Sequence, residues 1–428
     1  MKIKNDSNEI PWFKQYWINN DMNDIQGFPC FASLYFKNVF EGKEDNEDPN
    51  MIIKNHVISI YPDNIPIEIQ QSFVGIIISF LTFSKLNLHK IPSSFSWSNS
   101  EICTKVQILN SGNFIIFLLK MPNYFQSKAV ETALNNTLKI FELFEPNLLN
   151  GKLTDEMIME YIKNCILSRS FILEKYTFDV GNQMDFHFAV RPIDLFGDPS
   201  IITTTTQLFE IIKNISNDIL SVALFQKNNL IMSSFENWLT PVLLVFNNHF
   251  KFLDIVDKAK FINLYNRNYD NNEITKLKLF IIEYNDLTFF FMIKDNSNNV
   301  MNISSEIKSI ISNRIESFES EVSSSIGKNE KRNNVIGIWE DNHIVLYGEC
   351  NSNSLTEISK LYFDFQNNPK LVVAISNTLE SQVCGINFLD FEAFAETNSK
   401  YPWNSTLSKQ YENIRSAFPN LPDEFTCI

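Results

Sequence analysis

Glycine is scarce in this chain, which has 11 glycines among its 428 residues. The sequence contains no GxxxxGK(S/T) phosphate loop and no GxGxxG dinucleotide fingerprint. Those loops need glycine because the backbone must approach the phosphate oxygens closely. A GxSxG nucleophile elbow and an HExxH metal motif are missing as well. These absences argue against a nucleotide-hydrolysing enzyme, a dinucleotide-dependent oxidoreductase and a serine or zinc hydrolase.

Basic clusters are also absent, since no run of Lys or Arg occurs and the formal net charge is −14. Nucleic-acid binding relies on clustered Lys and Arg side chains that neutralise phosphates. Attraction to anionic lipid requires a surface of the same kind. The sequence therefore predicts no nucleic-acid partner, and it predicts that any membrane association is peripheral and depends on a protein partner.

Cysteine and histidine are few and scattered, and no two cysteines have CxxC or another metal-ligand spacing. In a reducing compartment such thiols are most simply core or surface residues. We therefore expect no bound metal, no cofactor and no catalytic residue. The positions are Cys30, Cys103, Cys165, Cys350, Cys384 and Cys427, with His56, His89, His187, His249 and His343.

Long apolar runs are missing, because the longest one, near residues 114–121, is too short to cross a bilayer. The first residues lack the apolar core of a signal peptide. Cys427 is second from the end of the sequence, whereas a prenylation box needs cysteine at the fourth position from the end. These observations predict a cytoplasmic location.

Apolar residues make up 44% of the chain, and phenylalanine alone occurs 38 times, so the chain can build several hydrophobic cores. The apolar periodicity predicts an α+β fold in which a strand–turn–strand–helix unit occurs three times. The expected strands are 30–36, 56–61, 101–109, 113–119, 219–225, 230–233, 277–283, 287–293, 335–339, 343–347, 371–375 and 383–388. The expected helices are 65–85, 128–144, 236–246 (disturbed by Pro241), 303–322 and 355–365.

Residues 65–85 predict a helix that lacks a charged face, since no charged residue lies between Glu68 and Lys85. A surface helix normally carries such a face. One apolar stripe would pack on the sheet, while a second apolar stripe and a stripe of small residues remain to be covered by another chain. The alternative is an ordinary core helix, which is the reading we adopt for residues 128–144 and 303–322. The predicted partner- or GTPase-binding residues are Ser72, Gly75, Ile76, Ser79, Phe80, Thr82 and Phe83.

Three other groups are candidate functional residues, and each has a simpler structural explanation. Asp254, Asp257 and Asp270 are acidic neighbours, but a solvated face explains them more simply than paired catalytic carboxylates. His187 lies between two phenylalanines with no nucleophile nearby, which favours a half-buried structural histidine. The aromatic group Trp12, Tyr16 and Trp17 fits either a partner anchor or packing back on the first domain, with packing favoured.

Several short segments resemble, in the same order, a family of tri-longin proteins. This is the Ccz family, which includes the Ccz subunit of the Mon–Ccz Rab exchange complex and the Inturned, Fuzzy and Hermansky–Pudlak type-four proteins. The chain is most similar to the Ccz subunit. The segments are residues 74–84, 140–144, 188–194, 224–231, 290–295 and 303–326.

The resemblance implies an α+β fold of three longin-like (roadblock-related) modules, each an antiparallel sheet with flanking helices. The corresponding domains would be residues 1–150, 151–270 and 271–428. It also implies a Mon-like longin partner, a late-endosomal Rab GTPase as the target, and recruitment to the late endosome, lysosome or vacuole membrane. Guanine-nucleotide exchange makes no bond and works by differential affinity, which agrees with the missing catalytic motifs.

Three alternatives stay open at this point. A Hermansky–Pudlak-type subunit would serve the Rabs of lysosome-related organelles, and a trafficking scaffold would have no exchange activity at all. A hydrolase would require a deep polar pocket that holds His187 with a carboxylate or a serine.

Overall fold

The structure of the chain is a computed structural model, and the statements below concern the residues that it describes. These are residues 29–37, 55–63, 65–88, 91–97, 100–122, 127–150, 152–178, 191–192, 199–226, 229–236, 238–249, 255–256, 259–268, 273–295, 302–314, 335–339, 344–347, 357–358, 360–362, 364–365, 368, 370–377, 382–388, 391–397 and 414.

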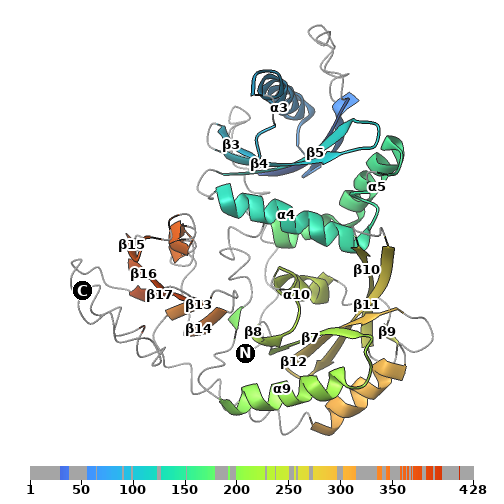
Figure 1. Cartoon of the computed structure of the whole chain (residues 1–428), viewed down its shortest axis with the longest axis vertical. Helices are drawn as coiled ribbons and strands as arrows, with labels where there is room; N and C mark the ends of the chain where they lie inside the picture. The colour runs from blue at the N-terminus through green and yellow to red at the C-terminus, as the bar shows by residue number, and fades with distance from the viewer. Residues whose placement is uncertain are drawn as a thin grey trace. The chain divides into compact units, whose positions relative to one another are not determined.

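The chain divides into two compact units. Unit 1 comprises Met1–Asp179 with Tyr265–Ile274, and unit 2 comprises Val180–Leu264 with Thr275–Ile428. Three sheets with flanking helices make up the described part, so the fold is α+β as expected (Figure 1). Among the strand pairs whose registers the structure describes, β6 with β8 is parallel and the others are antiparallel.

The sheet of unit 1 has five antiparallel strands in the order β2-β1-β5-β4-β3. The central strand β5 is buried along its whole length, as its nearly continuous apolar sequence predicts for a strand covered on both faces. The turn between β4 and β5 contains Gly112 at a φ of 82°, a conformation that glycine adopts without strain. The strands are β1 Cys30–Phe36, β2 Val57–Tyr61, β3 Ser94–Trp97, β4 Ser100–Ile108 and β5 Phe114–Pro122.

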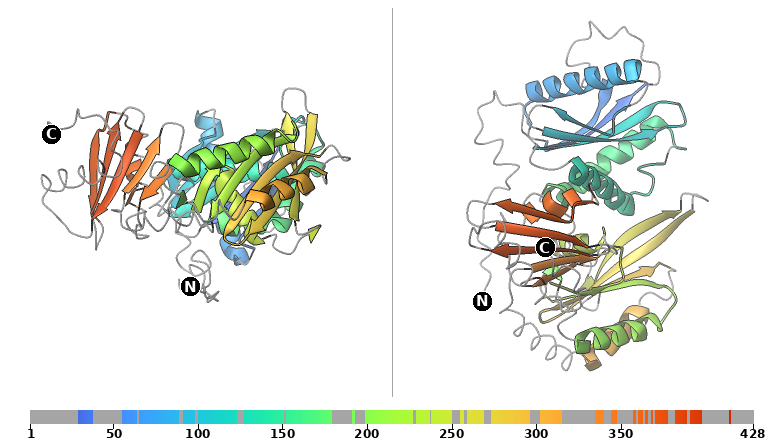
Figure 2. Two further views of the ribbon diagram at one scale, coloured as in Figure 1. Left: turned by 90° about the horizontal axis from the view of Figure 1, so that it is seen from below. Right: turned by 60° about the vertical axis from the view of Figure 1, so that its left-hand side comes forward.

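Helices cover both faces of this sheet, and Figures 1 and 2 show α3 alone on one face and α4 on the other. The α3 side buries alternate residues of the central strands, including Ala32, Leu34, Ile116 and Leu118. The opposite side buries Phe31 and Phe117 near Phe141 of α4. The helical elements are α3 Ile67–Leu88, α4 Ser127–Phe144, α5 Asp155–Ser168, α6 Ser170–Ile172 and the π-helix η2 Leu173–Thr177.

The second sheet lies in unit 2 and has the order β6-β8-β7-β12-β11-β10-β9. The helix α9, Pro199–Lys213, and the helix at residues 302–314 pack on one core of this sheet. The helix α10, Thr240–His249, begins at Thr240, so Pro241 falls in its first turn, where the missing N–H costs nothing. The strands are β6 Arg191–Pro192, β7 Ile219–Gln226, β8 Asn229–Ser233, β9 Ile255–Val256, β10 Ala259–Asn268, β11 Glu273–Tyr284 and β12 Leu287–Lys294.

The second sheet corrects the assignment of modules. The sequence pattern places the strand pairs at 219–233 and 277–293 in separate units, but β7 pairs with β12, so both belong to one sheet. Their inner residues form one core, and a local strand–turn–strand pattern contains no information about this distant pairing. The predicted boundary between residues 270 and 271 falls between β10 and β11, which are neighbours in this sheet. The three domain ranges remain a prediction.

The third sheet has the order β14-β13-β17-β16-β15 and lies in unit 2. A helical stretch between residues 357 and 365 contributes the buried Ile358, Leu361 and Phe365. At Gly385 the space is filled by aromatic rings, because a Cβ there would lie 2.9 Å from Phe365 and 3.0 Å from Phe394. The strands are β13 Val335–Trp339, β14 Ile344–Tyr347, β15 Val373–Asn377, β16 Gln382–Phe388 and β17 Phe391–Thr397.

The three sheets share one strand order. When the edge strands β6 and β9 of the second sheet are left aside, the second strand of each sheet is followed by a helix. The last strand then lies between the first strand and the strand before the last: β5 between β1 and β4, β12 between β7 and β11, and β17 between β13 and β16. The five-stranded arrangement of the first sheet therefore recurs in the third, and the second extends it with β6 and β9 at its edges.

Candidate functional site

The helix α3 packs one side on the sheet of unit 1. Phe73, Val74, Ile77, Ile78 and Leu81 are all buried there and belong to the core beneath the helix. Val74, Ile77, Ile78 and Leu81 are the first apolar stripe of the sequence, and their i, i+3, i+4, i+7 spacing is that of one helix face. Phe73 belongs to the second apolar stripe of the sequence, with Ile76, Phe80 and Phe83, but the structure buries it with the first. Each fully buried side chain of this size contributes about 1.5–3 kcal/mol of hydrophobic free energy.

The other side of α3 is apolar and exposed. Three large side chains lie on it with high exposed fractions: Ile76 at 39%, Phe80 at 36% and Phe83 at 60%. Ile67, which is 49% exposed, lies in the first turn of α3 on the same helix side as Val74 and Ile78. Between Glu68 and Lys85 the exposed side carries no charged residue. Exposed apolar side chains grouped without charges are characteristic of contact surfaces. We call this surface the outer face of α3.

Every binding residue predicted from the sequence lies outside the core of α3. The exposed residues among them are Ile76, Ser79, Phe80 and Phe83, and the half-buried ones are Ser72, Gly75 and Thr82. A Cβ placed on Gly75 would meet nothing within 4 Å, so the surface is open at this point. The structure thus brings the predicted residues together on one accessible side of a helix, and their role in binding stays a prediction.

The outer face continues onto the neighbouring edge strand β3. The rings of Phe80 and Phe95 lie with their centroids 4.3 Å apart, and Phe95 is half-buried. Sequence reasoning missed β3. The alternation of Phe95 and Trp97 with exposed serines is the period-two signal that could have found this strand.

Beneath α3 lies a buried lysine, Lys120 of β5, with no exposed surface. Its ammonium nitrogen lies 5.5 Å from the ring centroid of Phe73 and 5.8 Å from that of Trp97. Contacts of a cation with aromatic rings offset part of the cost of burial. Lys120 is therefore part of the support of α3 and is inaccessible to a ligand from outside.

The stretch Ile67–Ser84 of α3 is long and apolar enough to cross a membrane by length and composition, the only such stretch in the described part of the chain. Core helices of globular domains meet the same criterion. Since one side of this stretch is packed on the sheet, α3 is a sheet-covering helix in this structure.

A cluster of polar side chains surrounds Asp155, which lies in the first turn of α5 in unit 1. The Asp155 carboxylate accepts hydrogen bonds from Tyr35 Oη at 2.8 Å, Asn113 Nδ2 at 2.7 Å and Ser111 Oγ at 2.9 Å. Burial acts to raise the pKa of Asp155, but the bonds from Asn113, Tyr35 and Ser111 outweigh it, so this pKa lies below its ordinary value. Burial and then the bond to Asp155 raise the pKa of Tyr35 to about 12. The hydrogen bonds within this cluster pair Asp155 with Tyr35, Asn113 and Ser111, so the cluster holds α5 against the sheet.

We expect the Asp155→Ala variant to lower the stability of unit 1 by about 1–3 kcal/mol, because the three hydrogen-bond donors around Asp155 lose their charged acceptor. The folded pKa lies below the unfolded value of about 3.9, so the contribution is complete above that value and is lost as the pH falls through the folded pKa. Hydrogen exchange of the α5 amides at pH 7 measures the loss. The control is Glu156→Ala, which removes an exposed carboxylate from the same helix turn. Equal loss in both variants would contradict this role of the cluster.

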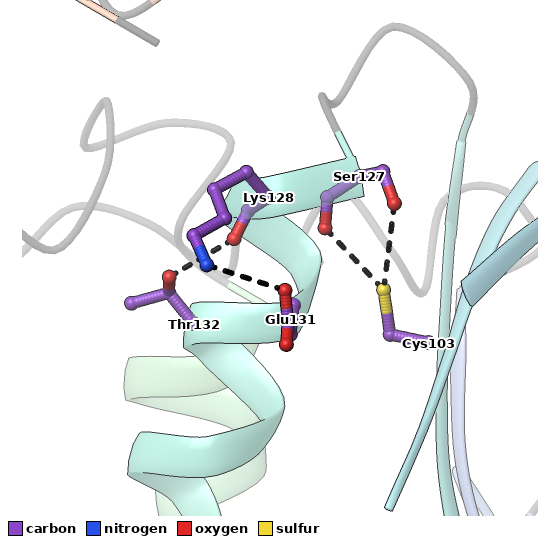
Figure 3. Close-up of polar contacts among 5 residues, drawn as sticks. All are labelled: Cys103, Ser127, Lys128, Glu131 and Thr132. Carbon is purple, nitrogen blue, oxygen red and sulfur yellow. Dashed lines mark hydrogen bonds and ion pairs between the residues drawn. The ribbon is translucent and has the colours of Figure 1, made fainter. Parts of the chain in front are cut away.

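The described cysteines are buried and unreactive. Burial raises the pKa of the Cys30, Cys103, Cys165 and Cys384 thiols to about 12, so they are protonated at neutral pH. Figure 3 shows the Cys103 sulfur directed at the first residue of α4, where it donates to the Ser127 carbonyl oxygen at 3.3 Å. Lys128 and Glu131 form an exposed ion pair in the same turn. Cys103 therefore has a structural role.

Within the described residues, no group of three or more His, Cys, Asp or Glu side chains could hold a metal ion. The remaining candidates of the sequence lie outside the described residues and stay untested by the structure. They are Trp12, Tyr16, Trp17, His187, Asp254, Asp257 and Asp270.

Comparison with known proteins adds little to this picture. No protein-family model matches the chain, and no curated protein matches it. Among solved structures, the chain is similar to the extracellular domain of a protein described as a histidine kinase, at 11% identity over 68% of this chain and 99% of that domain. The TM-score of this similarity is 0.17, which carries no argument about fold or function.

Proposed function

We propose that the chain is a Ccz-like subunit of a heterodimeric guanine-nucleotide exchange factor for a late-endosomal Rab GTPase. In this role it pairs with a Mon-like longin subunit and is recruited to the late endosome, lysosome or vacuole membrane through its partners. It acts there in endosome, vacuole and autophagosome maturation and in vesicle-mediated transport.

The observation that carries the proposal is the outer face of α3. It presents exposed isoleucine and phenylalanine side chains and no charge, so a partner can cover it without removing ions from water. The open surface at Gly75 allows a partner backbone to approach closely. A surface of this kind suits a stable protein partner better than a charged or small-molecule ligand.

The fold gives further support. A five-stranded antiparallel sheet with a helix after the second strand agrees with the longin plan implied by the sequence resemblance. The recurrence of the same strand order in the second and third sheets supports three such modules, although their sequences do not match closely. The order of the short resembling segments along the chain supports the Ccz family.

The mechanism needs rigid surfaces and no reactive group. An exchange factor accelerates nucleotide release by binding the nucleotide-free GTPase more tightly than the loaded one. Shifting such an equilibrium from 1:99 to 99:1 requires a preference of about 10⁴-fold. The sheet-backed helix α3 supplies a rigid element, and the buried, protonated thiols take no part.

Nucleotide release tests this proposal. The chain is co-expressed with a Mon-like subunit, and the purified complex is added to a late-endosomal Rab loaded with a fluorescent guanine nucleotide. We expect nucleotide release to accelerate by more than about 100-fold over the intrinsic rate, because an exchange factor binds the nucleotide-free Rab much more tightly than the loaded Rab. A panel of Rabs separates this function from the Hermansky–Pudlak alternative, because there the Rabs of lysosome-related organelles would respond. Formation of the complex without any release would instead establish a scaffold.

A further inference from the structure

Unit 1 is built from two separate stretches of the chain. Its main part ends at Asp179, and the distant segment Tyr265–Ile274 belongs to it as well. This segment contains the end of β10 and the start of β11, strands whose other residues belong to unit 2. We call its described residues, 265–268 and 273–274, the strap. Because the chain on both sides of the strap belongs to unit 2, noncovalent contacts must hold the strap in unit 1.

Arg267 of the strap binds the loop that joins α4 to α5. Its guanidinium group donates to the side-chain oxygen of Asn150 at 3.1 Å and to the carbonyl oxygen of Pro146 at 3.4 Å. A hydrogen bond from a charged donor is stronger than one between neutral groups. The donors of a guanidinium group also have a fixed geometry that suits two oxygens at once. Arg267 is therefore the side chain that fastens the strap to this loop.

Asn150 organises the loop that receives Arg267. It is buried, and its side-chain oxygen also accepts from the backbone N–H of Lys152 at 3.2 Å. Its side-chain nitrogen donates to the side-chain oxygen of Asn147 at 3.3 Å. Its carbonyl oxygen accepts from the N–H of Leu153 at 3.1 Å, directly before Thr154, which caps the start of α5. Release of Arg267 therefore acts on the residues that lead into α5.

The core of unit 1 does not depend on the strap. Among the described residues, the core beneath α3 contains none from the strap. The strap itself is poorly buried, since Ile274 is 40% exposed and Asn266 and Glu273 are exposed as well. Segments with few buried apolar contacts open at a low free energy, whereas core strands open only when the whole unit unfolds. The strap can therefore leave the loop while the sheet stays folded.

We propose that the strap is a conformational switch of unit 1. When Arg267 is bound to Asn150, the loop between α4 and α5 is closed and the start of α5 is fixed. When Arg267 leaves, the side-chain oxygen of Asn150 and the carbonyl oxygen of Pro146 become accessible to another hydrogen-bond donor, and the start of α5 loosens. Since β10 and β11 continue from the strap into unit 2, the switch links the state of these two strands to the position of α5.

Hydrogen exchange of the purified full-length chain tests this switch. We expect Arg267→Ala to accelerate exchange in the peptide that covers residues 145–154 by about tenfold or more, because the open form no longer competes with a hydrogen bond from a charged donor. Exchange of the β5 amides should stay as in the native chain. The control is Asn266→Ala, which removes an exposed side chain from the strap itself and should leave both peptides unchanged.

Unchanged exchange of residues 145–154 in Arg267→Ala would overturn the proposal, because Arg267 would then not hold the loop closed. Equal acceleration in β5 would overturn it too, since the strap would then be part of the folding core and not a switch. The measurement uses the chain without a Rab or a Mon-like subunit, so its outcome is independent of the nucleotide-release experiment.

Discussion

Ser79→Arg abolishes co-purification of the partner subunit or the GTPase, according to the proposed role of α3, and Gly75→Glu does the same. Both substitutions place a charge in the middle of the outer face, where a docked partner would bury it without a counter-ion. Such a charge costs about 3–5 kcal/mol, which weakens binding by more than about 100-fold. The isolated chain still folds, since Ser79 is exposed and the space at Gly75 is open. Pull-down from cells, followed by titration of the purified chains, measures the effect.

The matched control is Asn164→Arg, which introduces the same charge at an exposed position of another helix of unit 1. This variant should bind like the native chain. Circular dichroism of all variants shows whether each one retains its helices and strands. Normal binding by both Ser79→Arg and Gly75→Glu would show that the outer face of α3 is not the contact surface.

Gly385→Ala is expected to destabilise the third sheet by about 1–3 kcal/mol, the usual cost of overpacking a filled core. The added methyl group would lie 2.9 Å from one ring of Phe365 and 3.0 Å from the ring of Phe394, and both rings are buried. Rings held on all sides cannot turn away, so strand β16 or the helical stretch must move. Hydrogen exchange of the β16 and β17 amides measures the loss locally, at about tenfold per 1.4 kcal/mol.

Gly75→Ala is the opposite case and serves as the control for Gly385→Ala. Its methyl group meets open space, and alanine is a better helix former than glycine by about 0.5–1 kcal/mol. We therefore expect slower exchange of the α3 amides in this variant. Faster exchange in Gly75→Ala, or an unchanged third sheet in Gly385→Ala, would contradict the packing described here.

Local patterns of the sequence gave much of the secondary structure. The expected strand at 30–36 corresponds to β1 Cys30–Phe36, and the expected helices at 65–85 and 128–144 correspond to α3 Ile67–Leu88 and α4 Ser127–Phe144. These elements have strong periodicity or clear turn residues at their ends. The helix expected at 303–322 is described over residues 302–314, and its remainder lies outside the described residues.

Other elements went unpredicted although their signals are present. The helix α5 buries Ile158, Ile162, Cys165 and Ile166, which is a regular amphipathic spacing, and Thr154 caps its start. The pairings of β7 with β12 and of β13 with β17 had no such signal. Their registers depend on residues far apart in the chain, so no local pattern specifies them.

The candidate site was predictable in composition but not in orientation. The absence of charge between Glu68 and Lys85 is visible in the sequence. Since α3 is apolar on more than one side, periodicity alone cannot decide whether Phe73 or Phe83 faces the sheet. That choice follows from packing on β1 and β5, which buries Phe73 and leaves Phe83 60% exposed.

The shared strand order has a consequence for synthesis of the protein on the ribosome. In every sheet the strand that joins the two halves is the last one to emerge: β5, β12 or β17. Until it appears, the nascent sheet consists of separate hairpins whose inner edges and apolar faces are open to other chains. Translation that stops shortly before Phe114, Leu287 or Phe391 therefore produces a fragment that depends on chaperones to stay out of aggregates.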